Sequence, residues 1–131
     1  MELNEQTKLD IAKYKEKGNP VFATKLGGTD YVYLGLLRED LNKIRADAVQ
    51  EAEALINKLS DEEKADPKVQ KEVMSKIEDM EETFILSFAL ISPKITRDTI
   101  SKITVGTSKK LIDLVYKASG EAEEPSEPVK L

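Results

Sequence analysis

The strongest constraint on the fold is a pair of long amphipathic stretches joined by a charged connection that contains a proline. In the first stretch, apolar residues recur at spacings of three and four, which is typical of one buried helix face: Leu41, Ile44, Ala48, Ala52, Leu55 and Leu59. The second stretch repeats this spacing as far as Pro93: Val69, Val73, Ile77, Met80, Phe84, Phe88 and Ile91. Together they predict an antiparallel helical hairpin.

The connection "SDEEKADPK" carries two helix-start signals. Ser60 and Glu63 match a capping box, and Asp66-Pro67 has the form of an N-cap followed by the first helical residue. The chain therefore turns and begins a helix again. Near the end of that helix, "FILSFALISP" is apolar almost all round, so we expect it in the middle of the core.

A β-hairpin precedes the helices. The runs "VFATKL" (21–26) and "YVYLGL" (31–36) are rich in β-branched and aromatic residues, and "GGTD" between them supplies the positive-φ positions of a tight turn. A two-stranded hairpin is barely stable in water, so one face must pack on helices or on another protein. Both faces of the second strand are apolar, which leaves two interpretations: a strand covered on one face by the helices, or an edge that takes a partner segment.

Shorter helices flank these elements. One is predicted in "NEQTKLDIAKYKEK", capped by Asn4 or Thr7, and two more follow Thr96 and Thr107, with Val105-Gly106 between them. The buried stripe of the last helix is predicted to consist of Leu111, Leu114, Val115 and Ala118. The expected fold class is therefore α+β, mostly α: a single domain over 1–120, in which the β-hairpin packs on the helical hairpin and two shorter C-terminal helices. The acidic, proline-bearing segment 121–131 is expected to be disordered.

Residue types that carry catalysis are scarce. The chain has no His and no Cys, which removes the commonest general base, thiol chemistry and thiolate zinc sites. Two of the three carboxylates of Asp79, Glu81 and Glu82 could form a glycosidase-like catalytic pair, and Glu78 with Asp79 and Glu82 could hold a hard cation. No calcium-loop pattern accompanies them, so we interpret them as a solvated helix face. We expect no enzyme, no metal and no cofactor.

Nucleic-acid binding and membrane insertion are disfavoured. The chain has 25 acidic and 20 basic residues, whereas phosphate binding normally needs a basic excess. A small helix-turn-helix regulator using Lys109, Lys110 and Lys117 on the last helix is the weaker alternative. No apolar run is long enough to span a bilayer, and the polar N-terminus lacks a signal-peptide core. A soluble, intracellular protein is expected.

The order of these pieces resembles the small tail assembly chaperones of tailed bacteriophages. The resemblance rests on "DYVYLGLLREDLNKI", with its Leu-x-Arg-x-acid step into a helix, on the apolar run "FALISP" (88–93), and on the closing helix "VGTSKKLIDLVYKASG" (105–120). The chain departs from the family at Leu34-Gly35, where Arg-Pro is frequent, and in its longer charged middle, from about Asp47 to Glu78.

The resemblance implies a non-enzymatic chaperone in the host cell cytoplasm. Such a protein transiently binds a tail component, the tape-measure or tube protein, and keeps it soluble before assembly; nucleic acid and membrane are not expected as partners. The alternative is a structural virion or scaffold protein that stays in the particle. The client-facing residues are expected at the step from hairpin to helix: Tyr31, Tyr33, Leu34, Leu36, Arg38 and Asp40. The oligomeric state is left open.

Overall fold

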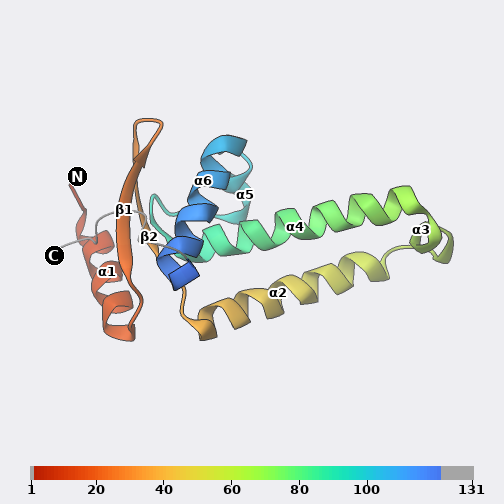
Figure 1. Ribbon diagram of the computed structural model, residues 1–131, viewed down its shortest axis with the longest axis horizontal. Helices are drawn as coiled ribbons and strands as arrows, with labels where there is room; N and C mark the ends of the chain where they lie inside the picture. Colours follow the sequence, from red (N-terminus) through yellow and green to blue (C-terminus); the bar gives the residue numbers. More distant parts are fainter. Residues whose placement is uncertain (1, 122–131) are drawn as a thin grey trace.

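A computed structural model describes residues 2–121 and has the predicted α+β, mostly helical architecture (Figure 1). A first helix leads into a three-stranded antiparallel sheet, a long helical hairpin and a C-terminal helical pair. The elements in chain order are α1 (Glu5–Lys17), β1 (Val21–Leu26), β2 (Thr29–Leu34), α2 (Arg38–Asn57), α3 (Asp61–Ala65), α4 (Pro67–Ala89), β3 (Leu90–Ser92), α5 (Arg97–Ile100), α6 (Val105–Tyr116) and a π-helical turn, η1 (Lys117–Glu121). Apart from Glu121, the segment 121–131 for which disorder was expected lies outside the described residues.

The predicted β-hairpin forms, with a tighter turn than expected. Gly27 and Gly28 alone make the turn, with φ values of 56° and 81°, which glycine adopts at no steric cost. Thr29 therefore belongs to β2 and pairs with Leu26, and Leu34 pairs with Val21. The expected strand 31–36 is correspondingly shifted two residues toward the N-terminus.

The third strand corrects the expectation that the second long helix runs to Pro93. Helix α4 ends at Ala89, and Leu90–Ser92 pairs with β2, so that the strand order is β1-β2-β3. Two physical reasons favour this ending. A residue that precedes proline, here Ser92, is disfavoured in helical conformation, and the open side of β2 offers backbone hydrogen bonds to the extended segment.

The core lies where α4 ends, between the sheet and α6. Ile85, Leu86, Ala89 and Leu90 are fully buried there, which confirms that the apolar run at the end of α4 lies in the core. The other face of the sheet packs on α1, and its buried residues form a second cluster: Ile11, Val21, Val32, Leu34 and Ile91. The sheet is therefore covered on both faces, which explains why both faces of β2 are apolar.

Helices α2 and α4 run side by side and project away from the sheet, with α3 at their far end (Figure 1). We call residues 45–82 the arm. Its seam uses the predicted stripe, but burial falls along its length: Ala48 and Ala52 are buried near the body, whereas Leu55, Leu59 and Val73 are only half-buried. Two helices alone cannot enclose their seam, because each flank of the contact stays open to solvent.

Most of the predicted helix starts are confirmed. The Asn4 side chain, rather than Thr7, caps α1 and accepts a hydrogen bond from the Thr7 N–H at 2.7 Å, and Ser60 with Glu63 forms the expected capping box. The start of α6 differs from the expectation. Its cap is Thr104, whose hydroxyl accepts from the Thr107 N–H at 3.3 Å, so Val105-Gly106 opens the helix instead of linking two helices.

Candidate binding surface

Most of the residues expected to face a client are buried. Tyr31, Tyr33, Leu34 and Leu36 are between 0% and 8% exposed. They belong to β2 or to the link that follows it, and β2 is the central strand, with β1 and β3 hydrogen-bonded on either side. The expectation of an exposed aromatic edge is therefore wrong, because β3 occupies the free edge and α1 covers the second face.

Arg38 is exposed at the start of α2, but Asp40 is only 3% exposed and has an internal role. Its carboxylate accepts hydrogen bonds from the Lys17 ammonium at 2.7 Å, the Asn19 side-chain amide at 2.8 Å and the Leu37 backbone N–H at 3.0 Å. These contacts join the end of α1 to the first turn of α2. Asp40 is thus a structural junction instead of a client contact.

The junction shifts the pKa values of both charged groups. Burial opposes ionisation of the Asp40 carboxyl, but the hydrogen bonds it accepts outweigh burial, so the pKa of Asp40 lies below its ordinary value. The hydrogen bond to Asp40 outweighs the desolvation of Lys17 and raises the pKa of that ammonium. Both shifts favour the charged pair in the folded chain.

The step from β2 to α2 is also closed by the chain's own C-terminal turn. A Cβ atom at Gly35 would lie 2.3 Å from the Ala118 carbonyl oxygen and 2.5 Å from the Pro20 side chain, so only glycine fits there. Next to it, the Leu36 N–H donates to the Ser119 hydroxyl at 2.8 Å. A close backbone contact therefore excludes any side chain at position 35.

Exposed apolar surface is found on the arm instead. Val49 is 56% exposed, Ile56 38% and Met74 58%. A groove of about 220 Å³ runs along one flank of the arm beside Val49, and its lining is mostly apolar: Arg45, Ala48, Val49, Ala52, Ile77 and Glu81. The Arg45 and Glu81 side chains, 3.9 Å apart across α2 and α4, form an ion pair at its border.

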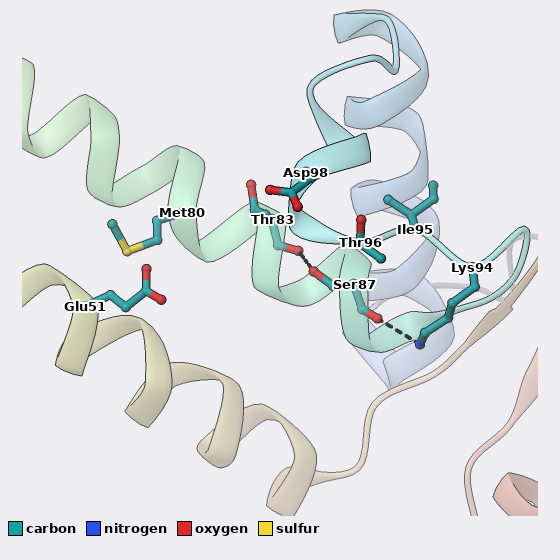
Figure 2. A pocket seen from close by; sticks show the side chains of 8 residues that line it. All are labelled: Glu51, Met80, Thr83, Ser87, Lys94, Ile95, Thr96 and Asp98. Atoms are coloured by element: carbon teal, nitrogen blue, oxygen red, sulfur yellow. Dashed lines mark hydrogen bonds between the residues drawn. The ribbon is translucent and has the colours of Figure 1, made fainter.

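A larger open groove of about 770 Å³ lies where α2, α4 and the start of α5 meet (Figure 2). Glu51 projects from α2, Met80 and Thr83 from α4, and Asp98 from α5. The Lys94 ammonium donates to the Ser87 carbonyl at 3.1 Å, and the Ser87 hydroxyl donates to the Thr83 carbonyl. A neighbouring groove of about 340 Å³ lies between α4 and the pair α5 and α6. It is lined by Asp79, Glu82, Thr83, Ile100, Ser101, Ile103, Val105, Ser108 and Lys109.

Only two of the three candidate catalytic carboxylates lie on the same groove. Asp79 and Glu82 are exposed on α4 beside the second groove, whereas Glu81 pairs with Arg45 on the other flank. Among residues 2–121, no group of three or more acidic side chains is placed to hold a metal ion. The same residues contain no helix that is both long and apolar enough to traverse a bilayer.

The candidate helix-turn-helix consists of a four-residue α5 and a twelve-residue α6. Lys109 and Lys110 are exposed near the start of α6, and Lys117 forms an ion pair with Asp113 at 3.0 Å.

In comparisons with known proteins, no family model, no curated protein and no solved structure matches this chain significantly.

The exposed apolar residues of the arm could have been found in the sequence, but the regular apolar stripe of each helix drew attention away from them. Val49, Ile56 and Met74 are apolar residues that lie outside the three-and-four stripe of their helices. Val49 and Ile56 are seven residues apart and so share a face of α2. Apolar residues off the buried stripe of a charged helix are the pattern that marks such a surface.

Proposed function

We propose that this chain is a non-enzymatic tail assembly chaperone of a tailed bacteriophage. It acts in the host cell cytoplasm, where it transiently binds a tape-measure or tube protein and keeps it soluble until the tail assembles. The arm and the grooves at its base take the role of the client-binding surface, in place of the buried strand β2.

The observation that carries the proposal is the open two-helix arm. Along its outer part the seam residues are only half-buried, and Val49, Ile56 and Met74 expose apolar side chains to solvent. A third helix laid along either flank would remove this surface from water, which contributes roughly 25 cal/mol per Å² of apolar area. The arm therefore gains stability from a helical client.

The charge distribution supports a holding function. The arm contains twelve acidic and six basic residues and so carries the acidic excess of the whole chain, whose net charge is −5. An acidic surface keeps a complex with an apolar client in solution, because complexes of like charge repel one another. The arm also coincides with the charged middle, about 47–78, which is longer in this chain than in the family that it resembles.

Co-expression tests the proposal directly. The tube and tape-measure proteins encoded in the same genome are each produced alone, with the wild-type chain, and with a Val49→Gln/Met74→Gln double variant. We expect the client to be insoluble alone, soluble with the wild type, and less soluble with the double variant, because both substituted side chains are exposed apolar groups on the arm. Leu9→Gln is the matched control, since Leu9 is 64% exposed on α1 and lies away from the arm.

Two results contradict the proposal. In the first, the clients are soluble without the chain; in the second, they stay insoluble with it. Circular dichroism of each variant shows whether the helices are retained. A structural virion protein is distinguished by its presence in purified particles at a fixed copy number, whereas a chaperone is absent from them.

A further inference from the structure

The two grooves beside α4 meet at Thr83, which lines both of them. They form one surface that begins between α2 and α4 and continues past α5 to the start of α6. We call this surface the double groove. It is lined by α2, α4, α5 and the start of α6 and by the loops on either side of α5, and none of its lining residues belongs to a strand.

Apolar side chains line the double groove along its length, interspersed with polar ones. Met80, Ile100 and Ile103 are half-buried there, and Val105, the first residue of α6, is 71% exposed. Apolar side chains spaced along a groove between helices are the recognition pattern for an amphipathic helix, whose residues at i, i+3, i+4 and i+7 form one apolar face. An extended peptide would leave its backbone hydrogen bonds unmade against such side chains.

The rim of the double groove is acidic. Among the side chains that the structure describes, four carboxylates border it, from Glu51, Asp79, Glu82 and Asp98, against two ammonium groups, from Lys94 and Lys109. Asp79 and Glu82 point to solvent on α4, and neither takes part in an ion pair within the described part of the chain. A cationic flank on the occupant would complement this rim, whereas an acidic flank would be repelled.

We infer that the double groove binds an amphipathic helix whose apolar face enters the groove and whose polar flank is basic. The inference rests on the proposed function, because it names the chemistry of the client segment. The apolar side chains supply the contact area, and the carboxylate rim selects the sign of the flanking charge and the orientation of the helix.

Synthetic peptides test this without any tail protein. The probe is a Leu–Lys peptide of about 18 residues with the helical apolar spacing, a length at which helices become stable enough to form on binding. Two control peptides have the same length: a Leu–Glu peptide with identical spacing, and a Leu–Lys peptide whose order is scrambled to abolish the apolar face. Binding to the full chain is measured by fluorescence anisotropy at two salt concentrations.

Of the three peptides, we expect only the amphipathic Leu–Lys peptide to bind the chain saturably. The Asp79→Asn/Glu82→Gln variant should weaken this binding about fivefold at low salt and by less at high salt, because exposed charges are screened. Val105→Ser should also weaken it about fivefold, through lost apolar contact. Matched controls are Asp61→Asn/Glu62→Gln, which changes the net charge equally at the far end of the arm (Figure 1), and Leu9→Ser.

The inference is overturned if the Leu–Glu or scrambled peptide binds equally well, or if the Asp61/Glu62 control weakens binding as much as the rim variant does. It is also overturned if sedimentation shows a dimer of this chain that the rim variant dissociates, since a second copy then occupies the double groove. Failure of the peptide with retained client solubility refutes this inference alone. Peptide binding without any effect on client solubility refutes the proposed function and leaves the groove assignment standing.

Discussion

Replacement of Asp40 by alanine tests the junction between α1 and α2. The side chain is 3% exposed and accepts three hydrogen bonds, so its removal leaves donors without their acceptor inside the fold. The three losses differ in size because the donors differ in exposure.

The Leu37 N–H loses its cap at the start of α2, which costs about 1 kcal/mol. The Asn19 amide loses a hydrogen bond to a charged group, about 1.5 kcal/mol, while it keeps its bond to the Gly35 carbonyl at 2.9 Å. Lys17, whose side chain is 39% exposed, turns to water at a cost of about 0.5 kcal/mol. We therefore expect Asp40→Ala to lower the free energy of unfolding by about 3 kcal/mol, or the Tm by roughly 10 °C.

Urea unfolding followed by circular dichroism measures this loss. Lys17→Met is the companion variant and should also lower the free energy of unfolding, because it leaves the buried Asp40 carboxylate without its cation. A loss below about 1 kcal/mol for Asp40→Ala, with the native helical signal retained, would refute the reasoning. It would mean that water replaces the carboxylate at the junction.

The same junction predicts a dependence on pH. The folded pKa of Asp40 is lowered, so its contribution is fully present above the unfolded value of about 3.9 and is lost as the pH falls through the folded pKa. Asp40→Asn has the same shape but cannot ionise. The stability gap between wild type and Asp40→Asn should be constant from about pH 8 to 5 and shrink below about pH 4. A gap that persists unchanged in acid contradicts the assigned cause.

Four further substitutions test the packing and the start of α6. Gly35→Ala should cost about 3 kcal/mol in urea unfolding, since its Cβ meets the Ala118 carbonyl and the backbone must move; a neutral result would show that the contact is loose. Thr104→Ala should cost about 1 kcal/mol, as the N-cap of α6, and Thr107→Ala clearly less; the opposite order would restore the helix start expected from the sequence. Leu86→Ala should cost about 3 kcal/mol, because this fully buried side chain would leave a cavity.

Local sequence patterns predicted the long elements because the forces that form them are local. Apolar residues at spacings of three and four predicted α2 and α4, and the glycine pair predicted the hairpin turn. Ser60 with Glu63 predicted the start of a helix. Each pattern reflects interactions between residues a few positions apart. Such interactions are present in the sequence whatever the tertiary arrangement.

Strand β3 illustrates what such patterns cannot predict. Three residues, Leu90–Ser92, carry no periodicity that separates a strand from the end of a helix. Their extended conformation depends on the open side of β2, a strand far away along the chain, and on the proline that follows. A long-range hydrogen-bonding partner leaves no trace in a local pattern.

The burial of the residues that were expected to face a client has a related cause. An apolar strand with no alternation is compatible with an exposed adhesive edge and with a central strand covered on both faces, and Tyr31 and Tyr33 fit either. The layers decide between the two: once α1 and β3 take their places, β2 is enclosed. The exposure of the charged helices of the arm is equally undetermined by local patterns. Their apolar stripe is the same in a two-helix arm as in a three-helix bundle, and only the number of neighbouring helices determines whether it is buried. In this chain exposed apolar side chains are therefore found on the highly charged arm, as well as on α1 and at the start of α6, whereas those of the most apolar strand are largely buried.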